Sequence, residues 1–542
     1  MTIGDLLTAQ ALTRPDTPAL IEHRAGKSLT FAQLDAAVAA ASVWWQTEAG
    51  LRRGDAVLVF VPMSSDLYVA LLGLFRIGAV ALFLDPSAGK THLEACCARW
   101  APRALFAIPR AHLLRLRSPA LRTIPLKITT RGWIPFTRRW LRFTSSDAIP
   151  QTLDSSISNL NSSPPLSSLP PPVRIEPTDP ALVTFTSGST GIPKAAVRTH
   201  AFLLAQYHAL APSLHLQPGD VDLATLPIFV LANLAAGVTT TLPDADLRKP
   251  GEVDAARLFA QIERDRVTRI AASPAFFERL IDYGQSTRRA LPDLRFLHTG
   301  GAPVFPRLLD ALRRLAPHAQ VVAVYGSTEA EPIAHLDHRD ITSDDLAVMS
   351  SGRGLLAGRP PPEIRLALLP DEFGRPRAPM TAASFHAARL PAGAIGEIVV
   401  TGEHVLKGYL GGHGDDETKF KVDNETWHRT GDAGSLDASG RLWLNGRCTA
   451  KIDDVHGRLY PFGIECIAMT FPGVRRAALV ALRGQRLLVI ESSHPSPELA
   501  TQLNAATASA HIEKIIFLDR IPVDRRHNAK IDYPALQKQL RL

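Results

Sequence analysis

A run of small and hydroxyl-bearing residues leads into a glycine, a proline and a lysine near the first third of the chain. It reads Thr186, Ser187, Gly188, Ser189, Thr190, Gly191, Ile192, Pro193 and Lys194. Glycine and serine let consecutive backbone N–H groups converge into a concave anion site, and the hydroxyl groups and the ammonium add donors. The spacing of the Walker loop is absent. The run therefore predicts a polyphosphate-binding loop rather than an ordinary surface loop.

A second cluster follows a β-prone run, residues 321–324, and gathers hydroxyl groups and a carboxylate at one point. Its members are Tyr325, Gly326, Ser327, Thr328 and Glu329. Mg²⁺ takes hard oxygen ligands, and a phosphorus atom under attack needs donors on its oxygens. The alternative is a Tyr-Gly turn with an exposed glutamate. The phosphate loop upstream favours the catalytic interpretation.

Three further positions complete the candidate set. The turn Thr299, Gly300, Gly301, Ala302, Pro303 allows the backbone to lie flat against a planar ring, although such a turn alone is weak evidence. Asp432, expected at a strand end, can accept both hydroxyls of a ribose, and Arg447 can reach the same nucleotide through charge-assisted bonds. Lys530 lies in a basic tail, where a lysine is usually a solvated surface charge.

These motifs, in this order, resemble those of the adenylate-forming superfamily, which includes acyl-CoA synthetases, peptide-synthetase adenylation domains and luciferases. The resemblance covers nearly the whole chain outside residues 144–172. It implies that the glycine-rich loop and Lys194 hold the ATP phosphates, that Gly301 to Pro303 and Tyr325 with Gly326 contact adenine, and that Asp432 and Arg447 hold the ribose side. It also implies that Thr328 contacts the α-phosphate, Glu329 holds Mg²⁺, and Lys530 is the catalytic lysine.

Local features resemble one branch, the β-lactone synthetases of bacterial long-chain olefin biosynthesis. These features are Val230 where many members have a histidine, the basic segment before the phosphate loop, a hinge with Thr449, and the run from Gly457 to Cys466. The branch implies that a long-chain β-hydroxy acid is activated as acyl-AMP and closes to a β-lactone, beside partner enzymes of the olefin pathway. The residues between Leu226 and Leu234 would help line its apolar pocket.

Two alternatives stay open. One is a long-chain fatty acyl-CoA ligase or acyl-AMP ligase. The other is an inactive ATP-binding scaffold, because the pocket histidine and the usual hinge residue are absent. The retained Lys194, Glu329, Asp432 and Lys530 argue against the scaffold.

Composition indicates a globular protein of more than one domain. The chain has 542 residues, 46% hydrophobic and 21% charged, with a formal net charge of +8 that does not indicate a nucleic-acid role. Four cysteines without metal-site spacing and no secretory signal predict a cytoplasmic protein. The apolar residues 68–84 are interrupted by Arg76 and Gly78, which favours a buried helix and strand over a membrane span.

The expected fold is α/β, with a large N-terminal domain of layered parallel sheets and helices (1–445) and a small, mobile α+β C-terminal domain (446–542). A strand at 56–60, a helix at 66–78 and a strand at 79–84 make a βαβ unit, which implies a parallel sheet. Thr30 is the expected N-cap of the helix that follows a short strand. Further strands are expected at 269–273, 295–298, 395–400, 476–482, 486–490 and 514–518, a hairpin at 450–460 and a helix at 464–471. Residues 144–172, rich in Ser and Pro, predict a disordered connector.

Residues 99–143 contain many arginines and no acidic residue, with Trp133, Phe136, Trp140 and Phe143 interleaved. Arginine beside aromatic residues suits a membrane interface. The other interpretation is a solvated face that packs on the sheet with its aromatic side chains inside. The sequence leaves both interpretations open.

Overall fold

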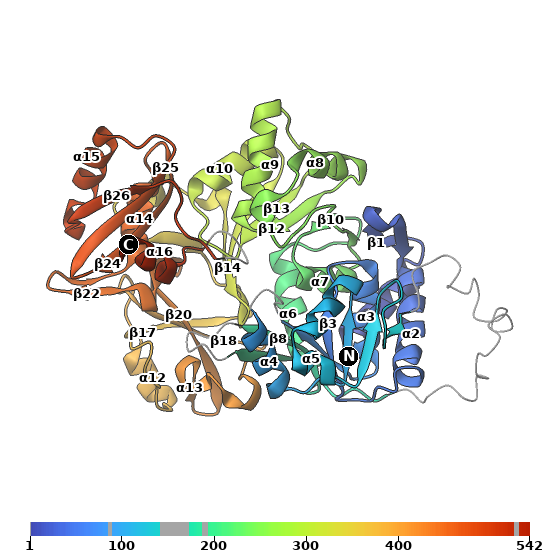
Figure 1. Cartoon of the computed structure of the whole chain (residues 1–542). Coiled ribbons are helices and arrows are strands. Elements are labelled where there is room, and N and C mark those ends of the chain that lie inside the picture. The colour runs from blue at the N-terminus through green and yellow to red at the C-terminus, as the bar shows by residue number, and fades with distance from the viewer. Residues whose placement is uncertain (1, 85–88, 141–172, 187–192, 525–529, 542) are drawn as a thin grey trace. The chain divides into compact units, whose positions relative to one another are not determined.

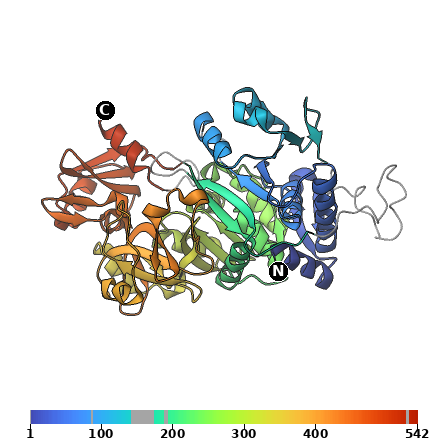
Figure 2. The same cartoon turned by 90° about the horizontal axis from the view of Figure 1, so that it is seen from below.

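The computed structural model describes residues 2–84, 89–140, 173–186, 193–524 and 530–541, and all structural statements concern these residues. The chain divides into a first unit, residues 1–244 and 408–414, and a second unit, residues 245–407 and 415–542. Figures 1 and 2 show sheets covered by helices in each unit. This division differs from the predicted boundary after Asn445, which stays a prediction.

A seven-stranded sheet forms much of the first unit, in the order β7-β6-β5-β3-β4-β8-β9, and all its neighbours except β8 and β9 pair in parallel. The predicted βαβ unit is confirmed, and Ser64 caps its helix by accepting a hydrogen bond from the Leu67 amide at 3.2 Å. The strands are β3 Ala56–Phe60, β4 Val80–Phe83, β5 Ala104–Ala107, β6 Leu126–Thr129, β7 Arg138–Arg139, β8 Pro180–Thr186 and β9 Lys194–Thr199.

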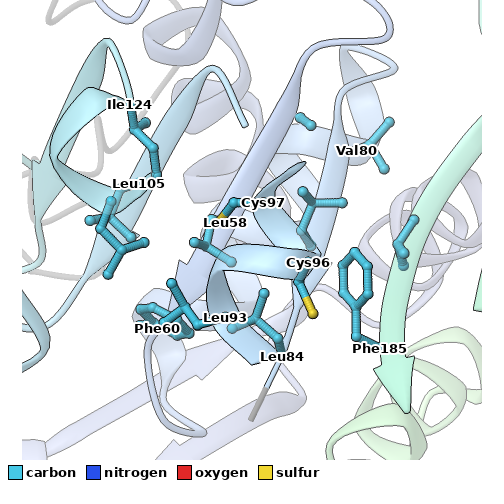
Figure 3. Close-up of a cluster of buried hydrophobic side chains, with 14 of the residues drawn as sticks. Leu58, Phe60, Val80, Leu84, Leu93, Cys96, Cys97, Leu105, Ile124 and Phe185 are labelled. Atoms are coloured by element: carbon cyan, nitrogen blue, oxygen red, sulfur yellow. The ribbon is translucent and has the colours of Figure 1, made fainter. Parts of the chain in front are cut away.

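The core on one face of this sheet lies under helix α4 (Lys90–Arg99), as Figure 3 shows. Leu93, Cys96 and Cys97 pack there among Leu58, Leu105 and other buried side chains of the strands. All four cysteines of the chain are buried and unpaired. Helices α3 (Ser65–Arg76) and α5 (Pro119–Thr123) also belong to this part of the unit.

The remaining strands of the first unit pair in the order β10-β11-β1-β2. Thr30 caps α2 as predicted, with a capping box that includes Gln33. The elements are α1 Ile3–Thr13, β1 Pro18–Glu22, β2 Lys27–Thr30, α2 Phe31–Thr47, α6 His200–Ser213, β10 Val221–Ala224, α7 Pro227–Ala236 and β11 Thr239–Thr241.

In the second unit, β12, β13 and β14 are parallel and β15 adds antiparallel to β14. β14 is longer than predicted, because it continues through Tyr325 and Gly326 to Ser327. The elements are α8 Ala255–Arg264, β12 Arg269–Ala272, α9 Pro274–Thr287, β13 Phe296–Gly300, α10 Pro306–Leu315, β14 Gln320–Ser327, β15 Ala330–Asp337 and α11 Ser343–Ser350.

An antiparallel sheet follows, in the order β16-β21-β20-β18-β17, with β19 paired to β20. β20 is 12 residues long, so Asp432 lies within the strand instead of at its end. The elements are β16 Leu355–Gly358, β17 Arg365–Leu369, α12 Ala382–Ala388, β18 Gly396–Thr401, α13 Asp415–Thr418, β19 Lys419–Val422, β20 Glu425–Leu436 and β21 Leu442–Arg447.

The last hundred residues form the predicted α+β arrangement, a hairpin and a three-stranded sheet with helices. Helix α14 begins three residues earlier than predicted, because proline is well suited to the first helical position. The elements are β22 Ile452–Asp454, β23 Gly457–Leu459, α14 Pro461–Met469, β24 Val474–Leu482, β25 Gln485–Ser492, α15 Pro497–Ala506, β26 Lys514–Leu518 and α16 Tyr533–Arg541.

Within the described ranges, no helix has both the length and the apolar character needed to cross a membrane. Residues 68–84 instead form α3 and β4 of the first core, as predicted. The predicted connector, residues 144–172, lies outside the described residues.

An ion pair with no exposed side-chain surface joins β18 and β20. The Arg429 guanidinium donates to both carboxylate oxygens of Glu397, at 2.7 Å for the shortest contact, and to the Arg375 carbonyl. Burial is costly for either ion alone, so each partner requires the other.

We predict that Arg429→Met lowers the free energy of unfolding by about 3–5 kcal/mol, because it leaves the Glu397 carboxylate buried without its partner. The matched control is Arg365→Met, which removes an exposed pair with Glu425 on the same sheet and should cost less than about 1 kcal/mol. Urea unfolding followed by circular dichroism measures both. Equal losses in the two variants would contradict the prediction.

Candidate active site

One carboxylate brings together three of the predicted site residues. Asp432 accepts a hydrogen bond from the Tyr325 hydroxyl at 2.7 Å and another from the Arg447 guanidinium at 2.8 Å. Tyr325 comes from β14, while Asp432 and Arg447 face each other on β20 and β21. Burial, with the Asp432 charge next, raises the pKa of the Tyr325 hydroxyl, and the Asp432 charge raises the pKa of Arg447. Tyr325 therefore stays a neutral donor.

The backbone before Asp432 is shaped for this position. Gly431 has a φ of 71°, and a Cβ there would lie 3.0 Å from the Phe373 ring, so glycine is required. The Thr430 hydroxyl accepts a hydrogen bond from the Asp432 amide at 3.0 Å. The register of β20 against β21 shifts after Ala433. These features aim the carboxylate away from the regular pleat.

Asp432, Tyr325 and Arg447 line a cavity of about 520 Å³ within the second unit. Its other predicted site residues are Gly301, Ala302, Pro303, Gly326 and Lys530. Gly300 permits the β13 backbone to approach β14, because a Cβ there would lie 2.4 Å from the Val324 carbonyl. Gly301 then turns with a φ of 80°. A volume of this size suits a small-molecule ligand.

Lys530 lines the cavity near the C-terminal end of the chain. Its backbone amide donates to the Asp524 carboxylate at 2.8 Å, and its carbonyl accepts from the Asp524 amide at 2.7 Å. Val523 and Ile531 form a β-bridge, and the Asp532 amide donates to the Pro522 carbonyl at 3.0 Å. The backbone of Lys530 is thus held against residues 522–524 by hydrogen bonds.

A buried pair beside Lys530 was not predicted from the sequence. The Tyr533 hydroxyl donates to the Glu465 carboxylate at 2.6 Å, and the Leu479 amide donates to the same oxygen at 3.1 Å. Both side chains line the cavity. Burial raises the pKa of the Glu465 carboxyl from about 4.5 to about 7. The pair ties α16, which begins three residues after Lys530, to α14.

Thr328 and Glu329 lie in the turn between β14 and β15 and are not among the residues that line the cavity. The Glu329 amide donates to the Ser327 hydroxyl at 3.3 Å, and the Glu329 carbonyl accepts from the Leu406 amide at 2.7 Å. The turn that presents both side chains is therefore held at its backbone.

Lys194 belongs to the first unit, where it opens β9 opposite Thr186, the last residue of β8. Its side chain is 8% exposed, and its ammonium lies 5.8 Å from the centre of the Tyr409 ring. Ser187, Gly188, Ser189, Thr190 and Gly191 fall outside the described residues. The backbone pairing of Thr186 with Lys194 fixes both ends of that loop.

The cavity also has a charged side that sequence reasoning missed. Arg307 of α10 donates to the carbonyls of Val474 and Arg475, the second at 2.7 Å. Burial raises the pKa of the nearby Glu278 carboxyl. No local spacing marks these residues, because they are brought together from three distant segments. The apolar residues 226–234, expected to line an acyl pocket, lie in or beside the buried helix α7 of the first unit and do not line this cavity.

Comparisons with known proteins show the family and the fold. The sequence profile described as AMP-binding enzyme matches residues 7–410. Proteins named olefin beta-lactone synthetase are 32% identical in Xanthomonas campestris, over 93% of this chain and 89% of that protein, and 31% identical in Stenotrophomonas maltophilia, over 93% and 90%. The amide bond synthetase McbA from Marinactinospora thermotolerans has the same fold, with a TM-score of 0.78 and 23% identity over 99% of each chain.

We predict that Glu465→Gln makes the protein more stable than the wild type at pH 8 but not at pH 4.5. The pKa of the Glu465 carboxyl is higher in the folded protein than in the unfolded chain. Its contribution to the free energy of unfolding is therefore complete below about pH 4.5 and is lost as the pH rises to about 7. At about 1.4 kcal/mol for each pH unit, the variant should gain up to about 3 kcal/mol.

Thermal unfolding midpoints between pH 4.5 and 8 measure this difference. The control is Glu48→Gln at an exposed position at the end of α2, which should follow the wild type. A Glu465→Gln curve parallel to the wild type across this range would contradict the assigned pKa.

Proposed function

Because the chain belongs to the family of AMP-binding enzymes, we propose that it activates a long-chain β-hydroxy acid with ATP and closes the product to a β-lactone. Enzymes of this family use ATP, and adenylate formation by this chain follows from its membership. The observation that carries the lactone step is the 32% identity, over 93% of the chain, with a protein named olefin beta-lactone synthetase. The partner enzymes would be those that supply the β-hydroxy acid and consume the lactone.

In the proposed complex, the adenosine of ATP occupies the 520 Å³ cavity. The Asp432 carboxylate accepts hydrogen bonds from the ribose hydroxyls. Its two oxygens have enough lone pairs to accept the hydrogen bonds from Tyr325 and Arg447 at the same time. Gly301 to Pro303 and Gly326 offer a flat backbone surface for adenine beside the Tyr325 ring. The contact of one carboxylate with two donors supports this arrangement.

The β- and γ-phosphates are assigned to the loop from Thr186 to Lys194. Its backbone amides and hydroxyl groups are the donors that a polyphosphate requires, and the pairing of Thr186 with Lys194 holds the two ends of this stretch together. Lys194 adds a positive charge.

The donor set fits Mg²⁺. A nucleotide-bound magnesium ion needs only one or two protein carboxylates, because the phosphates and water supply its other ligands. Glu329 is the carboxylate assigned to it, with the Thr328 hydroxyl directed at the α-phosphate. The ion would neutralise charge on the phosphate oxygens.

The chemistry has two displacements. A carboxylate oxygen of the acid attacks the α-phosphorus, the bond to the bridging oxygen breaks, and pyrophosphate leaves. The β-hydroxyl oxygen then attacks the acyl carbon, the acyl–oxygen bond to AMP breaks, and the hydroxyl proton passes to solvent as AMP leaves. The Lys530 ammonium neutralises the charge that develops between the carboxylate and the α-phosphate.

A hinge after Asn445 is part of this proposal. Gly446 has a φ of 133°, and a short 3₁₀ helix from Cys448 to Ala450 follows it. Glycine tolerates a wide range of backbone conformations, which supports a pivot between the adenylation domain and residues 446–542.

We predict that Lys530→Ala lowers the rate of adenylate formation by about 10²–10³, because one donor to the transition state is lost. ATP affinity should change little. Pyrophosphate release and nucleotide titration by calorimetry measure the two effects. Lys538→Ala, an exposed lysine of α16, is the control and should act like the wild type. Pyrophosphate release at the wild-type rate by Lys530→Ala would exclude this role.

The lactone step predicts that AMP is released from a long-chain β-hydroxy acid and ATP without coenzyme A. The same acid without its β-hydroxyl group should form the adenylate, detected by ATP–pyrophosphate exchange, but should turn over slowly. Mass spectrometry of the products identifies the lactone. AMP release that strictly requires coenzyme A would assign the chain to the CoA ligases, and absence of exchange with any fatty acid would indicate an inactive scaffold.

A further inference from the structure

Residues 99–140, here called the basic aromatic segment, carry half of the large hydrophobic side chains that are exposed in the described chain. Trp133 is 83% exposed and Phe136 is 90% exposed, with Leu113 at 61% and Leu116 at 74%. The other four, Leu12, Leu346, Ile395 and Val455, are scattered singly. Scattered apolar residues are ordinary, but a group within one stretch marks an interaction surface.

The segment is rigidly attached on its inner side. Trp140 is 1% exposed, and its ring centre lies 5.0 Å from those of Trp44, Trp45 and Phe106. Within the segment, the buried His112 contacts the Ile128 carbonyl at 3.2 Å. The aromatic residues of the segment therefore fall into two groups. Trp140 is buried, as expected if the segment packed on the sheet with its aromatic side chains inside. Trp133 and Phe136 are exposed instead. Phe143 is not among the described residues.

The exposed aromatic residues precede an edge of the sheet. β7, which carries Arg138 and Arg139, is the terminal strand of the seven-stranded sheet and pairs only with β6 in the described chain. A flat partner could approach this edge.

The charge of the segment is of one sign. It holds ten arginines and lysines and no acidic residue. Arg110, Arg117, Arg122, Arg131, Arg138 and Arg139 are exposed, and none forms an ion pair within the described residues. Among the described residues, Arg103 alone in the segment has an acidic partner, Asp55 at 3.4 Å. The stretch that carries the exposed apolar side chains therefore also carries guanidinium groups without an acidic partner in the described chain.

We propose that the basic aromatic segment docks the protein on the surface of an anionic lipid bilayer. Its arginines bind lipid phosphates, and Trp133, Phe136, Leu113 and Leu116 enter the boundary between headgroups and acyl chains. Aromatic side chains favour that boundary. A protein interface is a poorer fit, because the centres of such interfaces are depleted of charge. The inference does not depend on the proposed function.

Docking at a bilayer would place the enzyme where acids with long alkyl chains partition. An acid of this kind is poorly soluble in water, since each CH₂ group that leaves water favours its partition into lipid. The surface would thus raise the local concentration of substrate without altering the chemistry of the nucleotide cavity.

Co-sedimentation of the full chain with vesicles tests the proposal. Binding to vesicles of phosphatidylcholine with 30% phosphatidylglycerol should exceed binding to phosphatidylcholine alone by about tenfold or more, and should weaken as salt rises. Replacing Arg117, Arg131, Arg138 and Arg139 by serine should lower binding at least tenfold. The control replaces Arg52, Arg288, Arg313 and Arg314, which are exposed elsewhere, by serine and removes the same net charge.

A second measurement reports insertion directly. Vesicles with brominated acyl chains should quench tryptophan fluorescence of the wild type, and Trp133→Phe should keep vesicle binding while losing most of the quenching. Trp133→Ser combined with Phe136→Ser should weaken binding, whereas Val455→Ser, at a 95% exposed site, should not.

Three outcomes would overturn the proposal. They are equal loss of binding in the two four-arginine variants, quenching unchanged in Trp133→Phe, and capture by heparin or an acidic polypeptide without any binding to vesicles. The last outcome would assign the surface to a soluble polyanion. ATP–pyrophosphate exchange with a short, soluble acid should be unchanged in every variant, which shows that each variant is folded.

Discussion

The Asp432 carboxylate accepts hydrogen bonds from Tyr325 and Arg447, and this shared contact fixes the geometry of the cavity in the second unit. Tyr325 lies near the end of β14 in one sheet, while Arg447 ends the antiparallel strand β21 of another. A single acceptor therefore links strands of two sheets. In the proposed complex the same oxygens would also accept hydrogen bonds from the ribose hydroxyls.

The surrounding fold restrains this carboxylate. The buried pair of Arg429 and Glu397 anchors β20 three residues before Asp432, and Gly431 supplies the bend between them. On the opposite wall, Asp524 holds the backbone of Lys530, and Tyr533 with Glu465 holds the helix that follows. Charge and polarity are buried around the cavity only where a partner is present, which is the condition for a rigid site.

Local sequence predicted the elements and much of the site. Continuous apolar runs gave β3 and α3, and Thr30 was recognisable as a cap because Gln33 lies three residues later. Tyr325, Asp432 and Arg447 were marked by their motifs. Two pairs were missed, Glu465 with Tyr533 and Glu278 with Arg307. The members of the first pair are 68 residues apart in the sequence and those of the second are 29 apart, so only the tertiary fold brings them together. The roles of Thr328, Glu329 and Lys194 stay predictions.

The four cysteines have a consequence for an enzyme that would release a strained lactone. Such rings acylate thiolates, and the thiolate fraction of a cysteine falls as its pKa rises. Burial raises the pKa of Cys96 to about 12 and of Cys97 to about 11, and also raises those of Cys448 and Cys466. Enclosed and protonated, all four sulfur atoms are poor nucleophiles, so a lactone released by this protein would acylate its cysteines only slowly.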